Sequence, residues 1–377
     1  MKNTKGALIV LFLIIIVSAA LLFWVQSTVY DIIGLSVKEV RGEVLTTQLP
    51  REVTFTFVGD VMLARKVGRR MQERGLMYPF EKVESYLQTT DFTMGNVETA
   101  ISNRGNPLPG KVICFRAVPE TAFLLKKVGF DVVSLANNHV LDYDTEAFLD
   151  TIDLLESEEV KTVGAGKNIE KALEPVIIEK NGVKIGILAF TDMADIFFSH
   201  SYPRRFRAEE DIPGVASTDE NLMINAVKNL KPQVDILIVS LHWGVEYTDY
   251  PAVYPVNQRK LAQKLVDNGV DFLYGHHPHC IQTIEIYNNS VIAYSLGNFI
   301  FDQDWSQKTK EGLLLNLKFA PWGIKEVHVL PILIEDCQPQ IAKGEDAARI
   351  LDKLARISSE FGTQIIVDNE KGIIMER

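Results

Sequence analysis

The chain has 377 residues with 49 acidic and 39 basic side chains, which gives a formal net charge of −10 at neutral pH. This balance excludes general nucleic-acid binding, because neutralising phosphates requires clustered Lys and Arg. The three cysteines, Cys114, Cys280 and Cys337, are odd in number and scattered. Neither a disulfide framework nor a cysteine-type zinc site is therefore expected.

The first segment of the chain is apolar. Residues 6–25 carry no charge and match the roughly 20 residues that a helix needs to cross a bilayer. The competing interpretation, a secretory signal peptide, fits a run of this length less well. Lys2 and Lys5 precede the run, so the positive-inside rule predicts a cytoplasmic N-terminus and an extracellular main domain. We expect a single-pass cell-membrane protein with a cytoplasmic N-terminus (1–6), a transmembrane anchor (7–26), a stalk (27–50), a main domain (51–335) and a C-terminal extension (336–377).

The main domain alternates short apolar strands with helices. Residues 53–58 are β-branched or aromatic, which is typical of a strand. Strands that are apolar on both faces and alternate with helices predict an α/β fold of layered sheets. Glycines follow the expected helices and indicate where they end. The expected helices lie near 64–73, 119–128 and 257–268, and the further strands at 131–135, 183–190, 234–241, 270–274 and 291–296.

Polar side chains follow most of these strands. In open α/β sheets, ligands bind outside the carboxyl ends of the strands, so we expect these side chains to converge in one cleft. Several of them also have a plain structural interpretation, since Asp caps helices and Asn forms turns. The polar residues at strand ends are Asp60, Asn96, Glu98, Asn137, Asn138, His139, Asp192, His242, His276, His277, His279 and Asn298.

Three of the seven histidines, His276, His277 and His279, fall within four residues. A solvated, His-rich turn is one interpretation. Metal binding is favoured, because crowded imidazoles at a strand end become neutral ligands around a cation. Oxygen and nitrogen donors without a thiolate suit Mn, Zn, Fe or Mg. A bridging carboxylate flanked by histidines would allow two cations about 3.5–4 Å apart, so one or two divalent metal ions are expected.

Six short motifs follow one another along the chain. They are Gly59-Asp60-Val61-Met62, Gly95-Asn96-Val97-Glu98, Ala136-Asn137-Asn138-His139, His242-Trp243-Gly244, Gly275-His276-His277-Pro278-His279 and Ser295-Leu296-Gly297-Asn298-Phe299. In these motifs and their order the chain resembles the CapA/PgsA family of capsule and poly-γ-glutamate biosynthesis proteins, whose body is similar to the calcineurin-like metallophosphoesterase fold. The resemblance extends from about residue 54 to 302.

This resemblance implies a metallophosphoesterase-like α/β sandwich and a role for each motif residue. Glu98, or otherwise Asn96, would be the bridging carboxylate position, and His139 would act as the acid or stabilise the transition state. His276 would support the site or serve as an alternative ligand, and Asn298 would lie on the substrate side. The implied metal ligands are Asp60, Glu98, Asn138, His242, His277 and His279.

Two positions depart from the phosphoesterase pattern. Met62 stands where the pattern has a histidine ligand, and Asn96 stands where it has an Asp. Either one metal is held firmly and a second weakly, or a residue such as His276 compensates. The resemblance therefore implies a metal site more securely than it implies phosphoesterase activity.

The resemblance implies a role in making or exporting an anionic capsule polymer, poly-γ-glutamate, together with membrane synthase or export subunits. The mechanistic hypothesis is metal-assisted hydrolysis of a phosphoester or amide linkage of the nascent chain, with His139 as proton donor. Arg204, Arg205 and Arg207 form a local basic patch that would steer the polyanion. One alternative is a non-catalytic, metal-stabilised scaffold subunit, and another is a phosphodiesterase acting on an unrelated substrate, so catalysis stays open at this point.

Overall fold

The computed structural model divides the chain into two compact units, Met1–Pro50 and Arg51–Arg377. In the first unit, residues 17–29 are helical. Within the part of the chain that the structure describes, no helix combines the length and apolarity needed to cross a membrane. Positions 1–16 and 30–50, which include half of the predicted anchor (7–26) and most of the predicted stalk (27–50), lie outside the described residues. The described residues are 17–29, 51–196, 199–202, 204–253 and 256–375.

The second unit is built on two mixed β-sheets. In the larger sheet the strand order is β19-β20-β17-β16-β1-β2-β5-β6, with β15 beside β1 and β18 beside β17. The strands β1, β2, β5 and β6 run parallel. Their bounds are β1 (Val53–Val61), β2 (Phe92–Val97), β5 (Val132–Ser134), β6 (Lys161–Val163), β15 (Asn298–Ile300), β16 (Glu311–Ala320), β17 (Gly323–Glu335), β18 (Gln338–Ile341), β19 (Gln364–Asp368) and β20 (Lys371–Met375).

The second sheet has the order β13-β14-β12-β11-β9-β8, in which β9, β11, β12 and β14 are parallel. Two small ladders join β3 to β4 and β7 to β10. Their bounds are β8 (Val176–Lys180), β9 (Val183–Thr191), β11 (Ile236–His242), β12 (Phe272–His276), β13 (Ile284–Tyr287), β14 (Ser290–Ala293), β3 (Ala100–Ile101), β4 (Arg116–Ala117), β7 (Ala165–Gly166) and β10 (Gly214–Val215).

Helices connect the strands. The longest, α9, places Ile350, Leu351 and Leu354 in the apolar core shared by the two sheets. The predicted C-terminal extension thus contributes strands and core residues to the same unit. The helices are α2 (Arg65–Arg74), α3 (Glu84–Leu87), α4 (Glu120–Val128), α5 (Asp144–Ser157), α6 (Ile169–Ala172), α7 (Glu220–Leu230), α8 (Gln258–Asp267) and α9 (Gly344–Ser359), with 3₁₀ turns η1 (Tyr78–Phe80), η2 (Asp192–Asp195), η3 (Lys231–Gln233) and η4 (Lys308–Lys310).

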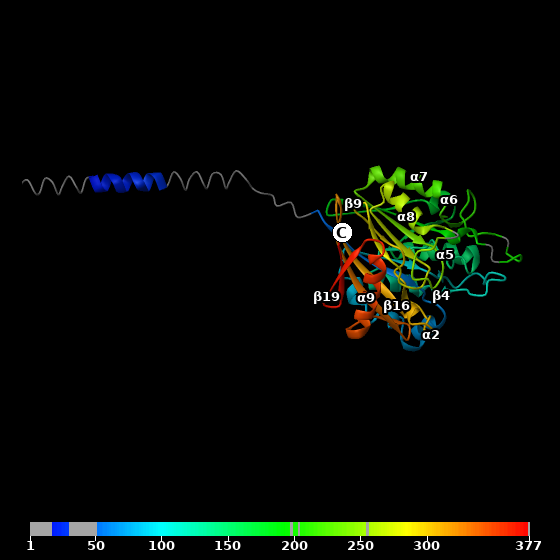
Figure 1. The fold of residues 1–377 in the computed structure, drawn as a ribbon. Coiled ribbons are helices and arrows are strands. Elements are labelled where there is room, and N and C mark those ends of the chain that lie inside the picture. The colour runs from blue at the N-terminus through cyan, green and yellow to red at the C-terminus, as the bar shows by residue number, and fades with distance from the viewer. Residues whose placement is uncertain (1–16, 30–50, 197–198, 203, 254–255, 376–377) are drawn as a thin grey trace, which may run out of the picture. The chain divides into compact units, whose positions relative to one another are not determined.

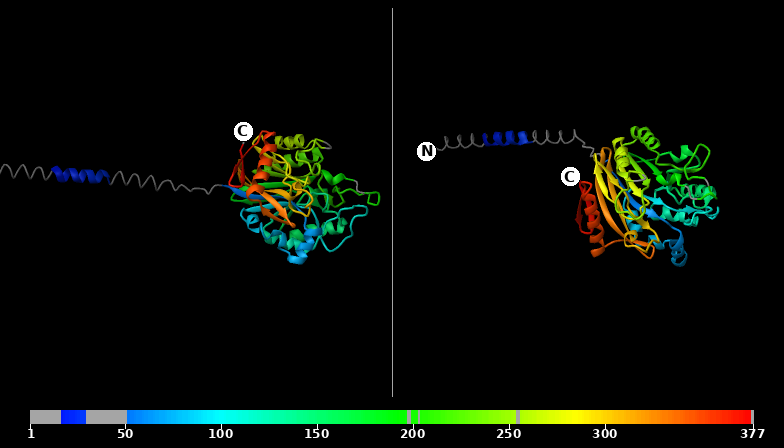
Figure 2. Two further views of the ribbon diagram at one scale, coloured as in Figure 1. Left: turned by 60° about the horizontal axis from the view of Figure 1, so that its bottom comes forward. Right: turned by 45° about the vertical axis from the view of Figure 1, so that its right-hand side comes forward.

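The two sheets pack face to face. The ring of Phe57 in β1 lies 4.7 Å from that of Phe272 and 5.0 Å from that of Tyr274, both in β12. Its neighbour Val58 points the other way, into the cluster formed with α2, α4 and α5. This alternation explains why β1 is apolar on both faces. Figure 2 shows orange strands of the first sheet and yellow strands of the second as two layers.

Helices cover the outer faces of both sheets. The helices α7 and α8 pack on the second sheet, and Figure 1 shows them on the opposite side of this unit from α2. The predicted layered α/β architecture is therefore confirmed at the level of a mixed α/β fold with several sheets. The carboxylate, amide and imidazole side chains of β1, β2, β11 and β12 lie at the carboxyl ends of these strands, at Asp60, Asn96, His242 and His276.

A close backbone approach shapes this edge. A β-carbon on Gly59 would lie only 1.9 Å from the carbonyl oxygen of Gly297, so the position requires glycine. The approach allows Asp60 N to donate a hydrogen bond to Gly297 O (3.1 Å). It also sets Asp60 in register with Asn298 of β15 on one side and Asn96 of β2 on the other.

Candidate metal centre

Asp60, near the end of β1, is a buried carboxylate surrounded by donors. Its Oδ1 accepts a hydrogen bond from Asn96 Nδ2 (2.9 Å) and lies 3.2 Å from His276 Nδ1. Its Oδ2 accepts from the backbone N–H of His277 (3.2 Å) and lies 3.3 Å from His279 Nδ1. Burial opposes ionisation, but His276 and His279 hold the pKa of Asp60 well below its usual value. Asp60 is therefore an ionised group that the protein itself fixes in place.

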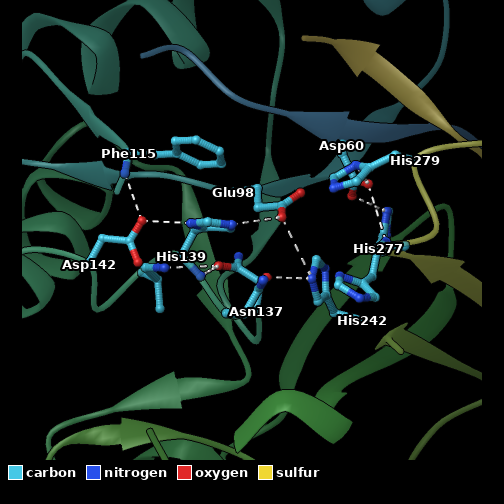
Figure 3. A network of polar contacts seen from close by, with 12 residues as sticks. Asp60, Glu98, Phe115, Asn137, His139, Asp142, His242, His277 and His279 are labelled. Carbon is cyan, nitrogen blue, oxygen red and sulfur yellow. Dashed lines mark hydrogen bonds and ion pairs between the residues drawn. The ribbon is translucent and has the colours of Figure 1, made fainter. Parts of the chain in front are cut away.

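Glu98, which directly follows β2, has the opposite environment. Both of its carboxylate oxygens are buried, and neither has a hydrogen-bond partner among the described residues. Figure 3 shows Glu98 between His139 and His242, whose Nε2 atoms lie 3.8 Å and 3.7 Å from Oε1. Burial, reinforced by the negative charge of Asp60, raises the pKa of Glu98 well above its usual value. An unpaired buried carboxylate is costly, and a bound cation would remove that cost.

His242 and His277 supply nitrogen atoms on the other side of the cluster. His242 ends β11, and its Nε2 lies 2.8 Å from Asn138 Oδ1. His277 has a left-handed φ of 91°, and its buried Nδ1 has no hydrogen-bond partner in the described part of the chain. Burial lowers the pKa of His277 to about 3 and that of His242 well below its usual value. Both rings are therefore neutral at neutral pH, the form in which imidazole binds metals.

His139 is held by a separate network. Its Nδ1 lies 2.6 Å from Asp142 Oδ2, and the ring donates this hydrogen bond to the carboxylate. Asp142 also accepts from the backbone N–H of Phe115 (2.7 Å) and pairs with Lys111. The Phe115 ring stacks on His139 with 3.9 Å between centroids. Burial lowers the pKa of His139 to about 4, so the neutral ring presents its unprotonated Nε2 toward Glu98.

Two groups of side chains, among those the structure describes, could each hold a metal ion. One consists of Glu98, His277 and His279, and the other of Asp60, Glu98 and His242, with the ligand atoms of each group within 4.8 Å of one another. Glu98 belongs to both groups, as a carboxylate that bridges two cations would. Its unpaired oxygens and the all-oxygen-and-nitrogen donor set fit Mn, Zn, Fe or Mg.

Comparison with known proteins identifies the family. Residues 54–303 match the family model described as bacterial capsule synthesis protein PGA_cap. The chain belongs to this family. It is 34% identical over 290 residues to the PGA biosynthesis protein CapA of Bacillus subtilis, covering 76% of this chain and 73% of that protein. It is 32% identical over 367 residues to the capsule biosynthesis protein CapA of Bacillus anthracis, covering 95% and 84%. The resemblance inferred from the six motifs is thus confirmed.

Among solved structures, the chain aligns with a putative 5'-nucleotidase from Staphylococcus aureus in complex with alpha-ketoglutarate. The identity is 12% and the TM-score 0.42, over 80% of this chain and 58% of that chain. A score this low carries no argument about fold or function. The membership of the PGA_cap family therefore rests on the sequence comparisons.

The structure brings most of the predicted site residues of this PGA_cap protein together. The implied ligands Asp60, Glu98, His242, His277 and His279 all belong to the two candidate groups, and their roles as ligands remain predictions. Asn138 adjoins them through His242. Asn298 Oδ1 lies 3.0 Å from His279 Nδ1, so it positions a histidine.

Asn96 and His276 lie against Asp60 rather than in either candidate group. Asn96 Nδ2 donates to Asp60 Oδ1, and its Oδ1 accepts from Asn137 Nδ2 (3.1 Å). Because both ends of the Asn96 amide are used, this residue holds its neighbours in place. Met62, at the position of the missing histidine, packs in the apolar cluster with α2 and supplies no nitrogen.

The basic patch has mainly local contacts. Arg204 donates to Thr145 Oγ1 and to the carbonyl of Pro213. Arg207 Nε donates to Asp195 Oδ1 (3.0 Å), and Arg205 is exposed. Two of these guanidinium groups thus tie loops together, and steering of a polyanion by the patch stays a prediction.

Sequence reasoning missed the residues that hold His139. Asp142 follows it by three positions, a spacing within one turn that offered a local signal. Lys111 and Phe115 come from a loop about thirty residues earlier, and no local pattern connects them to His139. Their role depends on tertiary contact alone.

Proposed function

We propose that this protein is a membrane-anchored, metal-dependent hydrolase that acts on an anionic capsule polymer, poly-γ-glutamate, as part of the machinery that makes or exports it. Membership of the capsule synthesis family and the names of the Bacillus relatives support the polymer. The observation that carries the hydrolase is Glu98, a fully buried carboxylate that has no hydrogen-bond partner among the described residues and faces neutral histidines. The apolar residues 6–25 support an anchor with the main domain outside the cell.

The divalent cations, when bound, would supply Lewis-acid polarisation and lower the pKa of water. Asp60, Glu98, His242, His277 and His279 would hold them. The surrounding apolar core keeps bulk water from these side chains, which strengthens every charge interaction in the site. Asp60 contributes one fixed negative charge, and Glu98 contributes a second that becomes favourable only beside a cation.

His139 is placed to move the proton. Asp142 accepts the hydrogen bond from Nδ1–H and thereby fixes the tautomer, while Lys111 anchors Asp142. The other nitrogen, Nε2, faces Glu98 and is available to exchange a proton. In hydrolysis of an amide, Nε2 takes a proton from the attacking water and returns it to the leaving nitrogen, so the ring ends unchanged.

The test uses the full-length protein in detergent, loaded with Mn²⁺ or Zn²⁺ and given a γ-linked glutamate oligomer. We expect new chain ends in the wild type and a loss of roughly a hundredfold or more in rate for His139→Ala. Arg356→Gln, a change at an exposed position on α9, is the control and should retain the wild-type rate. Absence of cleavage by a metal-loaded wild type would contradict the hydrolase.

A second candidate is a non-catalytic scaffold with a structural metal site. The packing of Met62 in the apolar cluster favours it, since the phosphoesterase pattern has a nitrogen ligand at that position. Polymer output of cells that carry His139→Ala separates the two. A scaffold predicts output close to that of the wild type, whereas the hydrolase predicts its loss.

A further inference from the structure

A groove of about 470 Å³ combines arginines with aromatic side chains beside the metal centre. Arg65 lies on its wall, with its guanidinium carbon 4.6 Å from the centroid of the Phe115 ring and 5.9 Å from that of Phe301. Phe115 stacks on His139, as Figure 3 shows, and the Phe301 ring lies 4.7 Å from that of His279. One aromatic layer therefore separates the groove from two histidines of the site.

The two arginines of the groove are in different states. Arg65 Nε donates to Asp302 Oδ2 (3.1 Å) and its Nη2 pairs with Oδ1, so its charge is compensated. Arg69 follows four residues later in α2, which places it on the same face of the helix. It is exposed and has no hydrogen bond or ion pair with the described part of the chain. Arg69 is thus a cation available to a ligand.

Exposed apolar side chains form another part of the groove wall. The side chain of Trp305 is 62% exposed and that of Ile113 is 51% exposed, and the Tyr247 ring lies 4.8 Å from that of Trp305 at 81°. Tyr247 has a left-handed φ of 64°, and its N–H donates to the carbonyl of Pro278 (2.8 Å), within the histidine segment. The metal-site loop therefore holds this wall, and its exposed large side chains are typical of a binding surface.

We propose that the groove binds a segment of a carboxylate polymer beside the metal centre. Arg69 pairs with a pendant α-carboxylate, and the methylene groups of the polymer pack on Trp305 and Tyr247. Guanidinium groups suit this ligand because their planar donors match a carboxylate in two parallel hydrogen bonds. A local cation is needed, since a chain with a net charge of −10 repels a polyanion as a whole. The choice of polymer rests on the proposed function.

Anisotropy of a labelled γ-linked glutamate oligomer, titrated with the full-length protein in detergent, tests this groove. We expect Arg69→Gln to raise the Kd roughly tenfold or more, as is typical for a lost charge-assisted hydrogen bond. Trp305→Ala should also weaken binding, and Arg356→Gln, with the same loss of charge on α9, should leave it unchanged. Thermal unfolding of each variant confirms that it is folded.

The proposal would be overturned by no binding to the wild type or by equal binding to Arg69→Gln and Arg356→Gln. Equal binding of an uncharged γ-linked oligomer whose α-carboxyl groups are amidated would also overturn it. A polyphosphate chain that competes as well as the carboxylate oligomer would also overturn it, because the groove would then lack the proposed selectivity. Titrations are made both with and without chelator. If the proposed hydrolase activity is wrong, the metal content and the cleavage assay will show it. If the proposed binding groove is wrong, these titrations will show it.

Discussion

Two buried glutamates of this protein have opposite surroundings. Glu285, in β13, is 2% exposed and accepts hydrogen bonds from Arg259 (2.8 Å), Gln263 (3.0 Å) and Tyr294 (2.7 Å). Glu98 is equally buried, yet both of its oxygens lack a partner among the described residues. The fold supplies every donor that Glu285 needs and none that Glu98 needs. This difference marks Glu285 as part of the fold and supports the proposal that a cation completes Glu98.

The largest expected effect concerns metal removal. If Glu98 is completed by a cation, chelation should destabilise the wild type by about 4 kcal/mol when the metal had been present at a thousandfold its Kd. Glu98→Gln should lose this dependence, because an amide is a poor metal ligand and needs no counter-charge. Thermal unfolding with and without chelator measures both. If chelator destabilised Glu98→Gln and the wild type equally, the proposed difference between the two glutamates would be wrong.

The matched change at the other glutamate has a smaller effect. Glu285→Gln should lower the free energy of unfolding by about 2 kcal/mol, because the charge-assisted bonds from Arg259 and Tyr294 weaken. Urea unfolding in chelator measures the loss. The metal content of this variant should equal that of the wild type, and a reduced content would show that the two glutamates are not independent.

The smallest expected effect concerns Asp192, whose surroundings are intermediate between those of Glu98 and Glu285. Its Oδ2 accepts from Gly244 N (2.9 Å), its buried Oδ1 has no partner in the described part of the chain, and burial raises its pKa to about 7. A raised folded-state pKa favours the neutral form, so this contribution to stability is present below about pH 4 and is lost as the pH rises through 7.

Asp192→Asn cannot ionise and should escape that loss. Relative to the wild type, the variant should gain about 1 kcal/mol between pH 6 and pH 7, because only the wild-type carboxyl group ionises in this window. The new amide donor lacks a partner, but its cost is the same at both pH values and does not change this difference. Urea unfolding in chelator at both pH values measures this difference. A gain that is the same at both pH values would mean that Asp192 does not titrate in this window.

The convergence within each sheet was predictable because it follows from strand direction. Within each sheet, the carboxyl ends of parallel strands meet at one edge, which gathers Asp60 and Asn96 in the first sheet and His242 and the His277 segment in the second. The packing of the two sheets that brings these two edges together depends on tertiary contact.

The motif around Glu98 implied a ligand role for this residue, but the lack of partners around Glu98 and the full set around Glu285 were not predictable from sequence. Only the positions of Arg259 and Tyr294 show which one is satisfied.

The same limit applies to His139. Its motif identified the residue, but the lysine that anchors its carboxylate partner comes from a distant loop. Likewise, the arginine patch was conspicuous in the sequence, whereas Arg65 and Arg69 looked like ordinary charges on a helix surface. Their place beside the aromatic groove depends on how α2, the Ile113 loop and Trp305 come together.

The proposal that a cation completes Glu98 is tested most directly by metal content. The full-length protein and its Glu98→Gln and Glu285→Gln variants are loaded with Mn²⁺ or Zn²⁺, and the metal bound to each is measured. We expect one or two bound cations in the wild type and in Glu285→Gln, and their loss in Glu98→Gln. A folded wild type that retains no metal, or a Glu98→Gln variant that retains as much as the wild type, would contradict the proposal.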